Sequence, residues 1–189
     1  MGERGSLAGA LLVADPSLHD PNFARSVVLM LDHDDDGAVG VVLTRPSEVL
    51  VDAVLPGWGD YVDAPARIFF GGPVSPESAI AIGVMRPESL GIEQQGVTKT
   101  AGIACIVDLD TAPRVAQQAL AAVRIFAGYA GWAAGQLEDE LAEGAWLVLE
   151  ADASDVASAD PQQLWSRVLQ RQGGWLAAAA AFPQDPSNN

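Results

Sequence analysis

One histidine and four aspartates stand together at Asp32-His33-Asp34-Asp35-Asp36, the most reactive-looking segment of this 189-residue chain. Imidazole and carboxylate groups are ligands for divalent cations such as zinc or manganese. Asp15, His19 and Asp20 would join this cluster if the first two strands were neighbours. The same residues also suit a solvated turn, because aspartate favours turns and its charge discourages edge-to-edge aggregation of strands. The spacing matches no familiar metal motif, so both interpretations stay open and we assign no metal ligand.

A second set of residues has the chemistry to bind an anion. Thr44-Arg45-Pro46 and Gly71-Gly72-Pro73 each follow a predicted strand. If the two strand ends meet, the Arg45 guanidinium and the glycine amides would form an anion-binding corner, to which His33 could add a donor. A salt bridge next to a tight turn would explain the same residues. Our hypothesis is that a phosphate, sulfate or carboxylate binds at Arg45, Gly71, Gly72, His33 and Thr44.

Familiar catalytic motifs are missing from the sequence. It contains no Gly-x-Ser-x-Gly elbow. The two pairs of adjacent glycines, Gly71-Gly72 and Gly173-Gly174, lack the spacing of a phosphate-binding or dinucleotide-binding loop. The whole chain contains two histidines, so few side chains are available for general acid–base catalysis. Glu138 and Glu140 could act as a carboxylate pair, but two residues apart on a helix they point in different directions. We predict no catalytic residue and no cofactor, and we favour a binding protein over an enzyme.

The elements that position these residues follow from hydrophobic patterning. Sequential strand pairs come first and helices cluster late, without βαβ alternation, which is typical of an α+β fold. Asp36-Gly37 predicts a hairpin between the second and third strands. Pro161, following Asp160, marks the start of a helix. The predicted strands are 7–14, 27–31, 39–43, 67–70, 79–85, 103–109, 123–129 and 145–150, and the predicted helices include 50–54, 114–122, 160–172 and 175–182.

The segment from Gly128 to Trp146 organises the rest of the chain. It predicts a strand end, a glycine turn, an amphipathic helix and a return strand. Leu137 and Leu141 lie one helical turn apart and face the core, while the acidic residues between 138 and 143 fall largely toward solvent. Trp132 and Trp146 bracket the helix, so we expect both indoles to be buried in the same core.

The composition favours one domain over residues 1–189. The chain is 49% hydrophobic and 19% charged, which is enough apolar content for one sizeable core. No repeat or linker divides it. We predict flexible ends at residues 1–6 and 183–189. Cys105 is the only cysteine, which excludes an internal disulfide, and its apolar neighbours predict a buried position.

The net charge limits the classes of partner. A formal charge of −15, with a pI near 4.2, repels nucleic-acid phosphates and anionic lipid headgroups. The ten Lys and Arg residues are scattered along the chain. We therefore expect no direct nucleic-acid binding and no membrane association. The apolar run at 7–14 is too short to span a bilayer and lacks the flanks of a signal peptide, which predicts a cytoplasmic protein.

The chain contains, in this order, the segments 9–14, 20–23, 33 with 40–43 and 45–46, 71–74, 128–132 with 136–138, Trp146 and 164–165. Together these segments resemble the bacterial AlgH/YqgE-like family, also known as UPF0301. They occur in the family's order over nearly the whole chain. One departure is Thr44, where the family usually has asparagine, so a role for that amide does not carry over.

The resemblance implies a fold more clearly than a function. It implies an α+β single domain in which a bifurcated, mostly antiparallel sheet curls into a barrel-like core flanked by helices. It implies no established reaction, although some members carry the label of transcriptional regulator. We expect a non-enzymatic cytoplasmic protein that acts through a protein partner or a small anionic ligand. The alternative is a metal-dependent or other hydrolase-type enzyme centred on His33 and the neighbouring aspartates.

Overall fold

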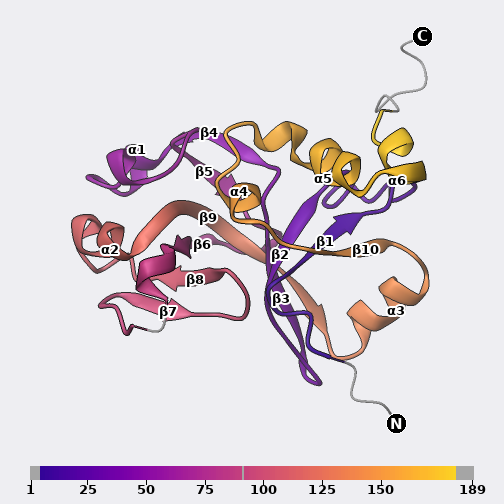
Figure 1. Cartoon of the computed structure of the whole chain (residues 1–189), viewed down its shortest axis with the longest axis horizontal. Coiled ribbons are helices and arrows are strands. Elements are labelled where there is room, and N and C mark those ends of the chain that lie inside the picture. Colours follow the sequence, from indigo (N-terminus) through magenta and orange to yellow (C-terminus); the bar gives the residue numbers. More distant parts are fainter. Residues whose placement is uncertain (1–4, 91, 182–189) are drawn as a thin grey trace.

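The longest strand, β9 (Leu120–Ala133), is the axis on which the other elements are arranged (Figure 1). This computed structural model describes residues 5–90 and 92–181 of the chain. The other strands are β1 (Ala10–Ala14), β2 (Val27–Asp34), β3 (Gly37–Val42), β4 (Pro46–Leu50), β5 (Arg67–Phe70), β6 (Val74–Met85), β7 (Val97–Lys99), β8 (Ala104–Val107) and β10 (Trp146–Glu150). The helices are α1 (Val51–Val54), α2 (Pro113–Ala119), α3 (Gln136–Ala142), α4 (Ala153–Val156), α5 (Leu164–Gln172) and α6 (Gly174–Ala179), with 3₁₀ turns η1 (Gly59–Tyr61), η2 (Pro87–Ser89) and η3 (Pro161–Gln163).

The strands form one sheet that splits at β9. Within the described residues its order is β10-β1-β2-β3-β9-β6-β8-β7, with β5 joined to β9 and β4 joined to β5. One edge of β9 pairs with β6. The opposite edge pairs first with β5, in parallel at Phe126, and then with β3, antiparallel from Ala130 onward. Two strands therefore follow each other along one edge of β9, which confirms the predicted bifurcated and mostly antiparallel sheet.

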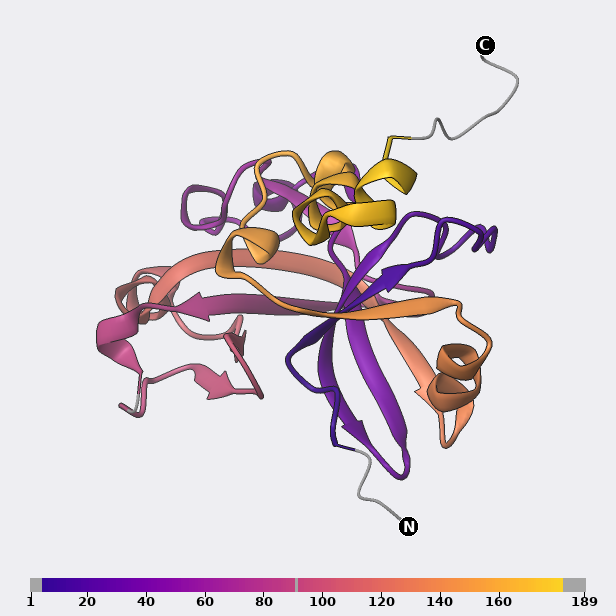
Figure 2. The same ribbon diagram turned by 45° about the vertical axis from the view of Figure 1, so that its right-hand side comes forward.

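The side chains of β9 alternate between two core clusters, as strand geometry requires. Phe126 and Ala130 pack in the larger cluster, with residues of β1, β2 and α5. Val123 and Ile125 pack in the smaller one, with residues of α1 and α2. Figures 1 and 2 show α4, α5 and α6 together over one face of the curled sheet. The curl and the helices confirm the predicted α+β class.

The structure differs from the sequence prediction mainly at element ends. The helix predicted at 114–122 ends at Ala119, because Leu120 pairs with Met85 and continues as β9. Pro46–Leu50 forms β4 against β5, between the predicted strand at 39–43 and the predicted helix at 50–54. Val97–Lys99 forms β7 between the strands predicted at 79–85 and 103–109, where no strand was predicted. In each case tertiary pairing overrides local propensity.

The predictions for the chain ends are described only in part. Residues 1–4 and 183–189 lie outside the described residues, as does Phe182 of the last predicted helix, which is observed as α6. Ser6 is described, and its hydroxyl donates to the His33 carbonyl at 2.8 Å. Within residues 5–90 and 92–181, no helix combines the length and apolar character needed to cross a bilayer.

Candidate functional site

His33 lies inside β2 and not in an exposed loop. The hairpin turns at residues 35–36, so β2 extends to Asp34 and leaves His33 only 9% exposed. Its Nδ1 accepts a hydrogen bond from the Leu7 N–H at 3.0 Å, and its Nε2 lies 3.0 Å from Glu138 Oε1. With Nδ1 as acceptor, a neutral imidazole donates from Nε2 to this carboxylate. His33 thus connects the N-terminal segment, β2 and α3.

The residues proposed to join His33 lie elsewhere. Val13 pairs with Val27, which places the loop with Asp15, His19 and Asp20 at the start of β2. His33 is six residues further along the strand, about 20 Å away at roughly 3.3 Å per residue. The neighbouring carboxylates serve the backbone: Asp32 Oδ1 accepts from the His33 N–H, at 2.9 Å. Across residues 5–90 and 92–181, no group of three His, Cys, Asp or Glu residues is arranged to hold a metal ion.

Glu140 has a partner that the sequence did not predict. Its Oε2 accepts hydrogen bonds from both indoles, at 2.8 Å from Trp132 Nε1 and 2.7 Å from Trp146 Nε1. Gln136 donates to its other oxygen at 2.9 Å. Both tryptophans are buried, as predicted, with ring centroids 6.0 Å apart. The prediction that the acidic residues between 138 and 143 fall largely toward solvent is wrong for Glu140, whose carboxylate faces the two indoles. The signal in the sequence is a glutamate on a helix bracketed by two tryptophans.

The two strand ends, whose meeting was the condition for an anion-binding corner, lie side by side. The Phe70 N–H donates to the Arg45 carbonyl at 2.8 Å, and the Val42 N–H donates to the Gly71 carbonyl at 2.9 Å. The Gly71 N–H, however, donates to Ala127 at 2.9 Å, within the sheet. A Cβ on Gly72 would lie 2.2 Å from the backbone of Tyr129. Close packing against β9 therefore explains why glycine stands at both positions.

Thr44 and Arg45 line a pocket formed by three separate segments of the chain. We call it the arginine pocket, because Arg25 lines it as well. Its volume is about 630 Å³, and its other lining residues are Ala24, Gln162, Gln163, Trp165 and Ser166. His33 is not part of it: His33 pairs with Ala38, whereas Arg45 follows the opposite end of β3.

Two polar groups of the arginine pocket, the Arg45 guanidinium and the Thr44 hydroxyl, make no hydrogen bond with the described residues. Burial lowers the pKa of the Arg45 guanidinium, and attraction to the Asp20 carboxylate offsets this only in part. Apart from this attraction to Asp20, the Arg45 side chain makes no hydrogen bond or salt bridge with the described residues. The Thr44 Oγ1 is buried and has no hydrogen-bond partner among them. A buried donor without a partner raises the free energy of the folded state, so this pair is suited to receive an acceptor.

Arg25 is held in place by its neighbours. Its backbone has a φ of 54°, in the left-handed region that few non-glycine residues adopt. Its guanidinium lies 4.7 Å from the centroid of the Trp165 ring, and Trp165 Nε1 donates to the Ala14 carbonyl at 2.8 Å. Sequence analysis missed Arg25, since nothing in its local pattern indicates that a residue before β2 meets one after β3.

The comparison with protein families settles the relationship of this chain. A model described as AlgH-like matches residues 11–177. The chain belongs to the AlgH-like family. Among curated relatives, UPF0301 proteins from Streptomyces avermitilis and Thermobifida fusca are 50% and 51% identical to it, covering 100% and 99% of this chain and 98% of each relative. A UPF0301 protein from Mycobacterium tuberculosis is 43% identical, covering 96% of this chain and 90% of the relative.

Solved structures agree with this AlgH-like assignment. A crystal structure of a Corynebacterium diphtheriae protein superposes with a TM-score of 0.87 at 33% identity, covering 96% of this chain and 95% of that one. The solution structure of the AlgH protein from Pseudomonas aeruginosa superposes with a TM-score of 0.68 at 29% identity, covering 98% of both chains. The predicted family is confirmed, and the function must be argued from the site.

Proposed function

We propose that this AlgH-like protein is a binding protein for a small anionic ligand, which it holds in the arginine pocket. The observation that carries the proposal lies on the wall of one pocket. There a half-buried Arg45 guanidinium, which makes no hydrogen bond or salt bridge with the described residues, stands next to the buried Thr44 hydroxyl, which has no hydrogen-bond partner among them. A phosphate, sulfate or carboxylate oxygen would give both groups a partner. Charge-assisted hydrogen bonds of this kind are each worth roughly 1.5–3 kcal/mol.

The charge of the pocket supports an anion over a neutral ligand. Its lining includes two arginines and no acidic residue. Arg25 is oriented by Trp165, so part of the entropy of fixing its side chain is lost before a ligand binds. Asp20 lies close enough to attract Arg45, and a ligand anion has to compete with it. The expected result is moderate affinity that weakens with added salt.

The test is a titration with sodium phosphate, followed by amide chemical shifts, with sodium chloride as a reference. We expect saturable shifts concentrated at residues 24–25, 44–45 and 162–166. Arg45→Gln should weaken binding by at least about tenfold, the equivalent of roughly 1.4 kcal/mol. Arg114→Gln removes the same charge from an exposed position on α2 and should leave binding unchanged.

Two results would overturn the proposal. Shifts spread evenly over the molecule would indicate non-specific ion effects. Equal affinities for Arg45→Gln and the parent protein would remove Arg45 from the site. The metal-dependent hydrolase centred on His33 stays the alternative hypothesis, and metal analysis of protein purified without chelator tests it.

A further inference from the structure

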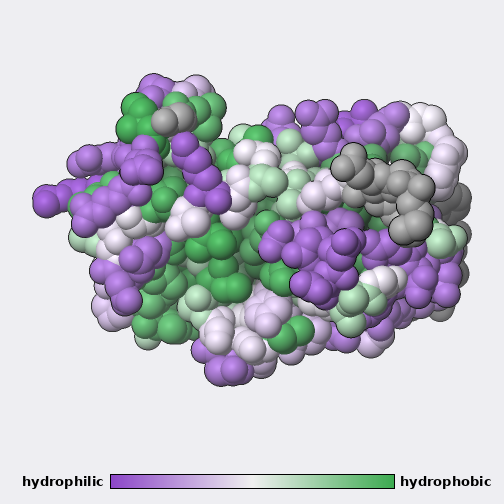
Figure 3. Space-filling model, turned by 90° about the horizontal axis from the view of Figure 1, so that it is seen from below, coloured by the Kyte–Doolittle hydropathy of each residue, from purple (hydrophilic) through white to green (hydrophobic). Residues whose placement is uncertain are grey.

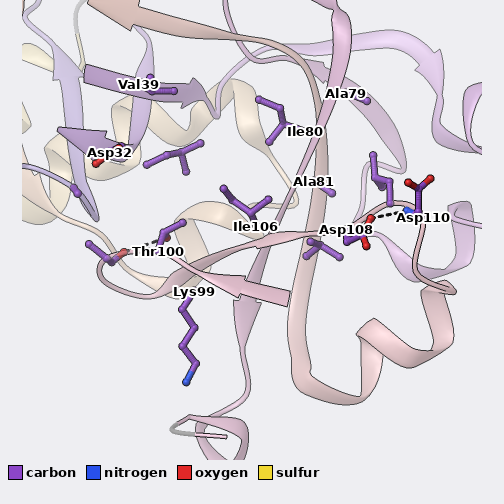
Figure 4. Close-up of a pocket in the computed structure, with 15 residues that line it drawn as sticks. Asp32, Val39, Ala79, Ile80, Ala81, Lys99, Thr100, Ile106, Asp108 and Asp110 are labelled. Atoms are coloured by element: carbon purple, nitrogen blue, oxygen red, sulfur yellow. Dashed lines mark hydrogen bonds between the residues drawn. The ribbon is translucent and has the colours of Figure 1, made fainter. Parts of the chain in front are cut away.

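A second cavity opens on the face of the sheet opposite α4, α5 and α6. It is a groove of about 840 Å³ between the two branches of the sheet. Leu31 and Val39, from β2 and β3, line one side, and Ile80 and Ile106, from β6 and β8, line the other (Figure 4). Seen from below, Figure 3 shows a hydrophobic hollow between hydrophilic margins.

The floor of the groove is unusually apolar for an exposed surface. Ile106 lies within β8, a strand paired on both edges, and yet it is 38% exposed. Ile80 and Val39 are partly exposed beside the same cavity. Single apolar residues scattered over a surface are normal in soluble proteins. A contiguous apolar hollow rimmed by polar residues is instead typical of an interaction surface.

The rim of the groove is acidic. Asp32, Asp108 and Asp110 line it, against one basic residue, Lys99. Asp108 is fixed in place, because its Oδ1 accepts from the Asp110 N–H at 2.9 Å. The formal charge of −15 on the chain adds to this local field. An occupant with positive charge is therefore attracted, and an acidic one is repelled.

We propose that this groove binds a segment of a partner protein in which apolar side chains are flanked by lysine or arginine. The apolar residues would cover Ile80 and Ile106, and the basic residues would face the aspartates of the rim. The groove is separate from the arginine pocket. Val39 contributes to the groove, while Thr44 and Arg45 follow the other end of β3. The two sites can therefore be tested independently.

The experiment measures binding of short synthetic peptides that alternate leucine and arginine. Matched peptides carry glutamate in place of arginine, or serine in place of leucine. We expect the leucine–arginine peptide to bind and to shift amides at residues 31–32, 39, 80 and 106. The glutamate peptide should bind at least about tenfold more weakly, and affinity for the basic peptide should fall with added salt.

Two variants locate the site. Ile106→Thr keeps a β-branched residue in the strand but removes apolar area, and it should weaken peptide binding by roughly tenfold. Val148→Thr is the matched control, because Val148 is 43% exposed on β10, outside the groove. Asp110→Asn should lower affinity for the basic peptide and reduce its salt dependence. None of these positions belongs to the arginine pocket, so phosphate binding there should be unchanged.

Three outcomes would overturn the proposal. The first is no binding of the leucine–arginine peptide, or equal binding to the Ile106→Thr variant and the parent. The second is binding of a small uncharged amphiphile in the groove without any peptide binding, which would assign it to a small molecule. The third is self-association of the protein that Ile106→Thr abolishes, which would assign the groove to a second copy of the chain.

Discussion

Glu140 shows how one side chain can stabilise a whole unit of the fold. It accepts hydrogen bonds from the buried indoles of Trp132 on β9 and Trp146 on β10, the strands that precede and follow α3. Glu140→Ala would leave both N–H groups without that partner. Each lost charge-assisted bond costs roughly 1.5–3 kcal/mol, and partial exposure of Glu140 reduces this, so we expect a loss of about 2–3 kcal/mol. Urea unfolding followed by tryptophan fluorescence measures it.

Glu143→Ala provides the control for this prediction. Glu143 is exposed at the end of the same helix, and its side chain has no hydrogen bond with the described residues. It should change the free energy of unfolding by less than about 0.5 kcal/mol. If the Glu140 and Glu143 variants unfold at the same urea concentration, the bonds to the two indoles contribute nothing measurable to stability.

At the scale of elements, the branch point of the sheet depends on backbones that pass very close together. Gly72 has a φ of 155°, and a Cβ there would lie 2.2 Å from the carbonyl carbon of Tyr129. Backbone atoms cannot move aside as a side chain can. Gly72→Ala should therefore force β9 away from the segment before β6. We expect a loss of more than about 3 kcal/mol, measured by thermal and urea unfolding.

Gly144→Ala separates crowding from backbone strain. Gly144 also has a positive φ, of 79°, but a Cβ there would meet no atom within 4 Å. The Gly144→Ala substitution should lower the free energy of unfolding only by the strain of the left-handed conformation, about 1–2 kcal/mol. Similar losses in the two variants would mean that conformation alone, and not close packing, requires glycine at the branch point.

The elements also show what the sequence could and could not predict. The hairpin of β2 and β3 and the helix after Pro161 followed from patterning and turn chemistry. The strand character of Leu120 did not, because its pairing with Met85 joins residues far apart in the sequence. The same limit applies to the site. Thr44 and Arg45 could be predicted from a polar strand end, whereas Arg25 reaches them only through the tertiary fold.

The placement of His33 is a further example of this limit. Its acidic neighbours suited an exposed turn. That interpretation used only the turn preference and the charge of residues next to His33 in the sequence. The hairpin instead turns two residues later, and Glu138, 105 residues away in the sequence, provides a partner at Nε2. A contact over that separation leaves no local pattern that periodicity or composition could reveal.

At the scale of the whole molecule, the two proposed sites differ in their local charge. The arginine pocket is locally basic within a chain of net charge −15, and the groove between the two branches of the sheet has an acidic rim. A small anion can enter the pocket because it meets the local field at short range. A long polyanion would also meet the acidic surface around it, where exposed charges act over about 8–10 Å at physiological salt.

This difference leads to a prediction about DNA. Non-specific affinity grows with the number of phosphates that Lys and Arg neutralise. Two arginines line the arginine pocket, so it could neutralise at most about two phosphates, and the remaining surface repels the duplex. We expect a Kd weaker than about 100 μM for duplex DNA at about 150 mM salt, measured by fluorescence anisotropy. Phosphate titration of the same sample shows whether the pocket is intact. A gel shift with submicromolar affinity at that salt would contradict the prediction, and loss of that shift in Arg45→Gln would then identify the pocket as the contact.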